Sequence, residues 1–371
     1  MRGTAPAAAC ERCLRSSYLV RQLAPRIAAI LDSPRRRARG VLALEDEELI
    51  AAVAGPRRAE AHDFLARFDP AARRAELVAA GVGAVCRHAD GYPAGLRDLA
   101  DPPPVLYWTG QAEAMARLEG DAVVTLVGAR RASPYGLEVA RELGRGLGVA
   151  GVTVVSGLAL GIDAAAHRGT LAGGGVPVAV LARGVDRAYP RTHRALFEEV
   201  RRRGAVVAEL PPGQEPFRWS FPARNRIMAA LASLTVIVEA GEPSGSLITA
   251  EFAADTGRAV GAVPGRVTSR QAAGTNRLLR DGADVIRSAE DVLDLVYGAG
   301  RRPEAATLEP SKLEPALRRV LDHVEGGGGL DAMAIATGLA PGELRAALGR
   351  LELLGLVARH PLGGYERRAA R

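Results

Sequence analysis

Arginines supply nearly all the positive charge of this sequence, and several of them lie where they could bind an anion. Arg224 and Arg226 lie just after Phe221-Pro222 at the predicted start of a helix, and Asn225 lies between them. A cation at a helix N-terminus is unfavourable by roughly 0.3–1 kcal/mol. Two arginines at such a position therefore indicate a bound anion, and we predict an anion-binding site there.

A second predicted helix start lies close to these arginines in the chain. The apolar run Leu234–Val238 has the length and β-branching of a buried strand. After it, Ser244, Gly245 and Ser246 open a helix whose first N–H groups have no intrahelical partner. These three residues are therefore predicted to offer backbone donors to the same anion.

Glycines, a serine and further arginines lie at similar positions. Most of them follow other predicted strands, and one arginine precedes the predicted helix that holds Arg224 and Arg226. Gly-rich turns in front of helix N-termini hold phosphate groups in α/β sheets. Phe221 and Trp219 lie beside the arginines, and aromatic rings stack on the bases of a nucleic acid strand. A sugar–phosphate backbone is therefore the predicted ligand. The residues at these positions are Gly128, Arg130, Arg131, Ser156, Gly157, Arg183 and Arg218.

Several carboxylates near the same strand ends have plainer interpretations. Asp163 and His167 are four residues apart on one predicted helix, and a structural pair is favoured over a catalytic one. Glu209 and Glu239 can be explained as neutralising nearby arginines. The sequence has no Walker lysine motif, HExxH motif, GxSxG elbow or complete set of metal ligands. We therefore predict that the protein uses no cofactor or metal.

The three cysteines of the chain are Cys10, Cys13 and Cys86. An odd number in a long chain argues against a disulfide framework and favours a reducing cytoplasm. Cys10 and Cys13 have the spacing of half a zinc knuckle, but no second such pair and no paired histidines follow. We predict ordinary thiols, and the role of Cys10 and Cys13 stays open.

Length and charge limit the class of protein. The 371 residues suggest two or three domains, and the net charge of +7 favours an acidic partner such as nucleic acid. Lys312 is the only lysine, so an arginine at a site says less than usual about bidentate recognition. The sequence shows neither a signal peptide nor an uncharged apolar run of membrane-spanning length. The predicted location is cytoplasmic, with no membrane partner.

A scaffold must bring the predicted strand ends together. From Gly81 on, β-branched runs alternate with helical patterns, which indicates a mainly parallel, doubly wound, Rossmann-like α/β sheet. Ligands of such sheets bind beyond the carboxyl ends of the strands. The predicted strands are Val82–Cys86, Val105–Tyr107, Ala122–Val127, Val152–Val155, Val176–Val180, Ala205–Ala208, Leu234–Val238, Ala259–Val263 and Asp284–Ile286. The predicted helices are Pro134–Leu147, Ile162–Leu171, Arg191–Arg202, Ala223–Leu231, Leu247–Thr256 and Asn276–Arg280.

Two further domains are predicted beside this sheet domain, which spans residues 81–298. Residues 1–80 are rich in arginine and alanine and have helical periodicity, which indicates a small helical domain. Residues 299–312 lose periodicity and are predicted to be a linker. Residues 313–371 have the helix pair and hairpin of a winged helix. Since only Arg345 and Arg350 place positive charge on its second long helix, contact with DNA and contact with protein stay open.

Several motifs of this sequence occur together in one known family. They are Gly128–Arg130, Ser156–His167 (SGLALGIDAAAH), Tyr189-Pro190, Phe221–Ile227 (FPARNRI), Ser244–Ala250 (SGSLITA), Ala262–Gly265 and Gly274–Asn276. Through these motifs, residues 81–290 resemble the DNA-processing protein A (DprA/Smf) family. The helical, SAM-like N-terminal domain and the C-terminal winged helix resemble those of the longer members.

The resemblance implies an extended Rossmann-like fold that binds single-stranded DNA without enzymatic turnover. It further implies that such a protein protects incoming DNA, loads a RecA-type recombinase on it during natural transformation, and forms a homodimer. Arg183 lies where the family usually has a small, Gly-rich turn, so this edge gains a charge. By motif matching, the DNA site would use Arg130, Phe221, Arg224, Asn225 and the Ser244–Ser246 turn, and Arg218 is added for its proximity in sequence.

Two other functions compete with this hypothesis. Phosphoribohydrolases on a related scaffold cleave nucleoside monophosphates and carry a Pro-Gly-Gly-x-Gly-Thr turn followed by Glu. Residues Pro243–Glu251 match that turn partly, without two of its glycines. A transcriptional regulator would instead use the winged helix on duplex DNA, with sequence specificity.

Overall fold

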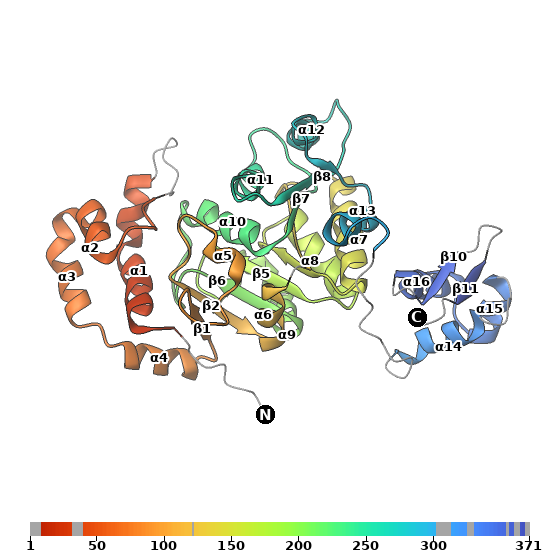
Figure 1. The fold of residues 1–371 in the computed structure, drawn as a ribbon, viewed down its shortest axis with the longest axis horizontal. Coiled ribbons are helices and arrows are strands. Elements are labelled where there is room, and N and C mark those ends of the chain that lie inside the picture. Colours follow the sequence, from red (N-terminus) through yellow and green to blue (C-terminus); the bar gives the residue numbers. More distant parts are fainter. Residues whose placement is uncertain are drawn as a thin grey trace. The chain divides into compact units, whose positions relative to one another are not determined.

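Nine strands form one sheet in the larger of the two compact units of the computed structural model (Figure 1). The structure describes residues 9–31, 40–120, 122–301, 313–324, 330–353, 356–359 and 364–367. The order across the sheet is β1-β2-β6-β5-β4-β3-β7-β8-β9. The strands are β1 (Gly83–Cys86), β2 (Val105–Gly110), β3 (Val123–Val127), β4 (Thr153–Ser156), β5 (Pro177–Leu181), β6 (Ala205–Ala208), β7 (Leu234–Ile237), β8 (Ala259–Ala262) and β9 (Asp284–Val285).

The prediction of a mainly parallel, doubly wound sheet is confirmed. β2 pairs antiparallel with β1 and with β6, and the other neighbouring strands of the sheet are parallel. The chain runs outward from β3 through β4 and β5 to β6, then returns and places β7 on the other side of β3. The carboxyl ends of β3 and β7 therefore form the topological switch point, where such sheets bind ligands.

Helices follow the strands much as their periodicity predicts. α10 begins at Ser220 rather than at Ala223, so Pro222 lies in the first turn, where a proline is tolerated. Within the described residues, no helix is both long enough and apolar enough to cross a membrane. The helices around the sheet are α5 (Ala94–Arg97), α6 (Ala112–Ala116), α7 (Pro134–Val149), α8 (Ile162–Ala172), α9 (Arg194–Arg203), α10 (Ser220–Leu231), α11 (Gly245–Asp255), α12 (Ala273–Arg280) and α13 (Ala289–Tyr297).

Apolar side chains leave the sheet alternately toward its two faces. In β5, Val178 and Val180 join one buried cluster, whereas Ala179 and Leu181 join another. The first cluster also holds side chains of α10 and α11, and the second holds side chains of α8 and α9. Because both faces are covered by helices, the strands need continuous apolar runs, as the sequence has.

The N-terminal helices are α1 (Glu11–Leu31), α2 (Asp46–Leu49), α3 (Arg58–Ala66) and α4 (Pro70–Ala79). α1 shares a buried cluster with the sheet through Leu14 and Tyr18. The hydroxyl of Tyr107 in β2 also donates a hydrogen bond to Oγ of Ser17 at 3.0 Å. These helices therefore lie in the same compact unit as the sheet, and the predicted domain boundary at residue 80 stays a prediction.

The C-terminal winged helix is confirmed. It consists of α14 (Pro315–Val324), α15 (Leu330–Thr337), α16 (Pro341–Leu353) and an antiparallel hairpin of β10 (Val357–Arg359) and β11 (Tyr365–Arg367). Its own apolar core joins the three helices to β10. Most of the predicted linker, residues 302–312, lies outside the described residues.

Candidate nucleic-acid interface

A groove of about 480 Å³ lies at the switch point, between the ends of β3 and β7 and the N-terminal turns of α10 and α11. Parallel strands bring their carboxyl ends to one edge, so segments more than a hundred residues apart meet here. Nine of the residues predicted from the sequence line this groove. They are Gly128, Arg130, Arg131, Phe221, Arg224, Asn225, Ser244, Gly245 and Ser246.

An arginine and an aromatic ring lie in contact at the groove. The guanidinium carbon of the exposed Arg130 lies 4.9 Å from the ring centroid of Phe221, a cation–π contact. The half-buried ring of Phe221 in turn meets Tyr189, with centroids 5.6 Å apart and planes tilted by 50°. A guanidinium and an aromatic face together can hold a phosphate and a stacked base.

The start of α11 also lines the groove. Ser244 is the N-cap, and its Oγ accepts a hydrogen bond from the N–H of Ser246 at 3.4 Å. Nδ2 of Asn225 donates to the carbonyl of Gly245 at 3.0 Å, which joins α10 to this turn. The positive end of the α11 dipole therefore faces the groove with a fixed turn, an arrangement suited to an anion.

Arg224 lines the groove, but its hydrogen bonds point into the sheet. Its Nη1 donates to the carbonyls of Gly157 at 2.5 Å and Val180 at 3.2 Å. Burial lowers the pKa of Arg224, and the nearby Asp163 carboxyl acts in the opposite direction. Since α10 begins at Ser220, Arg224 lies beyond the first turn. The prediction that Arg224 lies at a helix N-terminus is therefore wrong, whereas its contact with a bound anion stays a prediction.

Arg226 is a second correction. Its side chain is 1% exposed, and Nη2 donates to Oε1 of Glu209 at 2.6 Å, while Nε lies 3.3 Å from Oδ2 of Asp101. Both carboxylates are internal to the protein, so the positive charge of Arg226 is neutralised there. Arg226 does not line the groove, and the interpretation that Glu209 neutralises an arginine is confirmed.

Four more predicted residues lie outside the groove lining. Arg183 is buried and pairs with Glu215, whose Oε1 lies 2.9 Å from its Nη2. Ser156 is buried and donates to the carbonyl of Leu126 at 2.6 Å, and Gly157 supports the guanidinium of Arg224. Arg218 is exposed but not among the residues that line the groove. A strand end alone therefore does not place a side chain in the groove.

Trp219 faces away from the groove. Its side chain is buried in the cluster that joins α1 to α10, and the indole N–H donates to the carbonyl of Ala24 at 3.4 Å. The ring also stacks on Phe217, with centroids 6.3 Å apart. The prediction that Trp219 lies beside Phe221 as a stacking surface is therefore wrong.

Two acidic residues at this edge, Asp163 and Glu239, hold neighbouring loops through hydrogen bonds. Oδ2 of Asp163 accepts the N–H groups of Gly157 at 3.1 Å and Ala159 at 3.4 Å. Glu239 accepts the N–H of Ser133 at 2.7 Å and its hydroxyl at 2.5 Å. Burial raises the pKa of Asp163, although Arg224 opposes this. The hydrogen-bond partners of the Asp163 carboxylate are backbone N–H groups, and both ring nitrogens of the buried His167 have no hydrogen-bond partner among the described residues. The prediction that Asp163 and His167 form a pair is therefore wrong.

Two further polar residues of the groove, Arg270 and Gln271, were not predicted. Both are exposed and follow β8, and Nε2 of Gln271 donates to the carbonyl of Arg131 at 3.2 Å. Their position just after β8 could have indicated this placement, because β8 is the parallel neighbour of β7 and ends at the same edge of the sheet. With Arg130, Arg131 and Arg270 exposed and the carboxyl of Asp163 buried, the accessible charge of the groove is positive.

Comparison with known proteins agrees with this arrangement. A family model described as DNA recombination-mediator protein A matches residues 83–297, and one described as the DprA winged helix domain matches residues 302–363. A putative DNA processing protein DprA of Mycobacterium tuberculosis is 41% identical over 276 residues, which cover 72% of this chain and 69% of that protein. Protein Smf of Escherichia coli is 34% identical over 287 residues, 74% of this chain and 75% of that protein.

Solved structures show the same similarity. The structure of DNA processing protein A from Streptococcus pneumoniae superposes with a TM-score of 0.60 at 29% identity, over 76% of this chain and 95% of that one. A structure of DNA processing protein A from Helicobacter pylori, described in terms of its single-stranded DNA binding mode, has a TM-score of 0.51 at 28% identity. It covers 57% of this chain and 93% of that one.

Proposed function

The chain belongs to the DNA recombination-mediator protein A (DprA/Smf) family, and we propose that it binds single-stranded DNA in the groove between β3 and β7. The observation that carries this proposal is the pair of Arg130 and Phe221, which lines the same groove as the N-terminus of α11. Phosphates would lie against Arg130, Arg131 and the α11 turn, and a base would stack on Phe221.

The groove chemistry favours a single strand over a duplex. Bases in a duplex are already stacked on each other, so an isolated aromatic ring cannot contact their faces without opening the helix. A flexible strand can present a base to Phe221 while its backbone follows the arginines. We therefore assign the groove to single-stranded DNA and leave duplex contact to other surfaces.

The further steps of the proposal rest on family membership. The bound strand is protected from nucleases, and a RecA-type recombinase is loaded on it during natural transformation and recombination. The protein acts as a homodimer in the cytoplasm, by binding rather than by turnover. The similarity to proteins named DNA processing protein DprA supports this proposal.

Fluorescence anisotropy with labelled oligo-dT and a matched duplex, each at two salt concentrations, tests the proposal. We expect tight, salt-sensitive binding to the single strand and weaker binding to the duplex. Arg130→Ala should lower the affinity and reduce the slope of log affinity against log salt by about 0.7 for one lost phosphate contact. Equal affinity for both forms of DNA would contradict the proposal.

Arg201→Ala provides a control with the same change in net charge. Arg201 is exposed in the last turn of α9, just before β6 begins, so it lies at the edge of the sheet opposite the groove. Its replacement should leave oligo-dT affinity unchanged. If Arg201→Ala and Arg130→Ala weaken binding equally, the effect is one of overall charge and the groove assignment fails.

Phosphoribohydrolase activity is the alternative that needs a direct assay. The turn at Pro243–Ser246 lies at the groove, but it lacks two glycines of the hydrolase turn. We expect no free base when the protein is incubated with nucleoside monophosphates. Release of base that depends on Glu251 would favour the hydrolase instead.

A further inference from the structure

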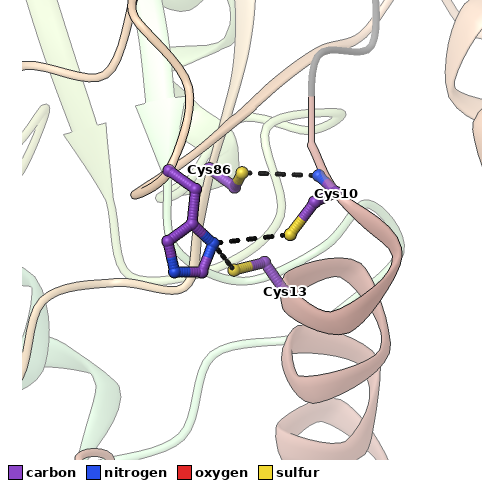
Figure 2. Close-up of side chains that lie close together, drawn as sticks. Cys10, Cys13 and Cys86 are labelled. Carbon is purple, nitrogen blue, oxygen red and sulfur yellow. Dashed lines mark hydrogen bonds between the residues drawn. The ribbon is translucent and has the colours of Figure 1, made fainter.

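Three cysteines and one histidine meet where α1 begins and β1 ends. Figure 2 shows Cys10, Cys13 and Cys86 close together, and the imidazole of His88 completes the group, with Nδ1 near the sulfur atoms of Cys10 and Cys13. One potential ligand atom from each of the four residues lies within 4.8 Å of all the others. This cluster lies outside the groove, and the DNA-binding proposal does not use it.

The fold brings these ligands together from two distant segments. Cys10 immediately precedes α1 and Cys13 lies in its first turn, so both sulfur atoms belong to one helix start. Cys86 is the last residue of β1, and His88 follows in the next turn. α1 lies against the sheet through Leu14, in the cluster that also contains Cys13 and Cys86.

The distances between the ligand atoms fit a tetrahedral metal site. Nδ1 of His88 lies 3.5 Å from Sγ of Cys10 and 3.4 Å from Sγ of Cys13. Zinc bonds of about 2.3 Å to sulfur and about 2.0 Å to nitrogen, at tetrahedral angles, place such atoms about 3.5 Å apart. The cluster therefore needs little rearrangement to hold an ion at its centre.

Neighbouring groups are suited to thiolates. The N–H of Cys10 donates to Sγ of Cys86 at 3.3 Å, and hydrogen bonds of this kind stabilise a sulfur that carries negative charge. The two N-terminal cysteines also lie at the positive end of the α1 dipole. Three thiolates and a neutral imidazole leave one net negative charge on a bound Zn²⁺, which the adjacent Arg87 can offset.

We propose that Cys10, Cys13, Cys86 and His88 bind one Zn²⁺ as a structural site. Three sulfur ligands and one imidazole suit zinc, and four protein ligands leave no open position for a substrate. The ion fixes the start of α1 to the end of β1, and so ties the N-terminal helices to the edge of the sheet. Cys13 and Cys86 are buried and Cys10 is half-buried, whereas His88 is exposed.

Metal analysis of the full chain, purified under reducing conditions, tests the site. We expect one equivalent of zinc per chain by elemental mass spectrometry. After exchange with Co²⁺, the visible spectrum should show the intense bands of a tetrahedral cobalt–thiolate centre. Chelation with EDTA should lower the melting temperature, and added Zn²⁺ should restore it.

His88→Ala is the decisive variant, because an exposed side chain can be removed without disturbing the buried core. Loss of a direct ligand should weaken zinc binding by more than about 100-fold in competition with a chromogenic chelator. The melting temperature of this variant should no longer respond to EDTA. His62→Ala is the control, since His62 is a half-exposed histidine in α3 and no part of the cluster.

Three results would overturn the proposal. The reduced chain could fail to take up Zn²⁺ or Co²⁺ when either is supplied. His88→Ala could bind zinc as tightly as the unchanged protein. The purified chain could instead contain a disulfide between Cys10 and Cys13 that, once reduced, leaves thiols with no affinity for the metal.

Discussion

At the residue scale, the arginines of the central domain divide into two kinds. Arg130 is exposed over the ring of Phe221, and its charge is available to a ligand. Arg226 is enclosed by Glu209 and Asp101, and Arg224 donates to sheet carbonyls. The first kind can serve DNA binding, whereas the second holds loops and strands in place. Substitution of the first kind should therefore lower DNA affinity, and substitution of the second kind should lower the free energy of unfolding.

Arg226→Ala should destabilise the fold. The change leaves the carboxylates of Glu209 and Asp101 buried without a cation, and removal of one partner from a buried ion pair costs about 3–5 kcal/mol. Urea unfolding should show this loss in the free energy of unfolding. Arg201→Ala, at an exposed pair, should change it by less than about 0.5 kcal/mol. If the Arg226→Ala protein were as stable as the unchanged protein but had lost DNA affinity, Arg226 would have to be assigned to the DNA-binding site.

His167 should make stability fall on the acid side. Burial lowers the pKa of this imidazole from 6.5 to about 3. Between these values the unfolded chain binds a proton that the folded chain excludes. The free energy of unfolding therefore decreases as the pH falls below about 6.5, by up to about 1.4 kcal/mol per pH unit from this group.

Urea unfolding at several pH values between about 5 and 7 measures this dependence. His167→Asn removes the titrating group, so its stability should vary less with pH over that range. His62→Asn, at a half-exposed site, should keep the dependence of the unchanged protein. An equal pH dependence in His167→Asn and the unchanged protein would show that His167 is not responsible.

At the element scale, the start of α11 serves both the fold and the groove. Ser244 caps the helix. Asn225, in α10, donates a hydrogen bond to the carbonyl of Gly245 in the same turn. The two helices therefore meet at the place where the backbone donors of α11 face the groove. An N-cap contributes to helix stability, and here its position also sets the geometry that a phosphate would meet.

Ser244→Ala should lower the free energy of unfolding by about 0.5–2 kcal/mol and also weaken oligo-dT binding. The matched control is Asp69→Ala, because Asp69 caps α4 by accepting the N–H groups of Ala71 and Ala72. Its loss should cost similar stability with no change in affinity. Calorimetry and anisotropy on both variants separate the two effects. Equal affinity of the two variants would exclude the α11 turn from the DNA site.

At the scale of the whole molecule, the chain forms two compact units. One contains residues 1–148 and 152–292, and the other contains residues 149–151 and 293–371. Among the described residues, the core of the winged helix uses residues from Leu313 to Val357 together with Tyr365. The described residues that line the groove all belong to the first unit. Binding of a single strand should therefore not require the winged helix.

A chain that ends at residue 298 should keep its oligo-dT affinity within the error of an anisotropy titration. It retains every residue that lines the groove. Its circular dichroism and melting curve would serve as the folding control. A folded, shortened chain with much weaker binding would place part of the DNA site in the winged helix.

Much of the fold followed from local patterns. Hydrophobic periodicity is written along each segment, so strands such as Leu234–Val238 and the helices between them could be located without knowing what they pack against. Parallel strands all end at one edge, and this geometry alone gathered Arg130, Phe221 and the Ser244–Ser246 turn at one predicted site. Nine of the predicted residues line the groove for that reason.

Only the tertiary structure decided which partners those side chains meet. Arg226 pairs with Glu209, 17 residues away, and with the more distant Asp101, and Trp219 packs on α1 against Ala24, 195 residues away in the sequence. The cysteine pair looked incomplete because Cys86 and His88 lie more than seventy residues away. Periodicity fixes which face of an element is buried, but pairing between distant side chains depends on how the elements dock. The exposed charge of the groove and the ligand set of the zinc site were therefore visible only in the folded chain.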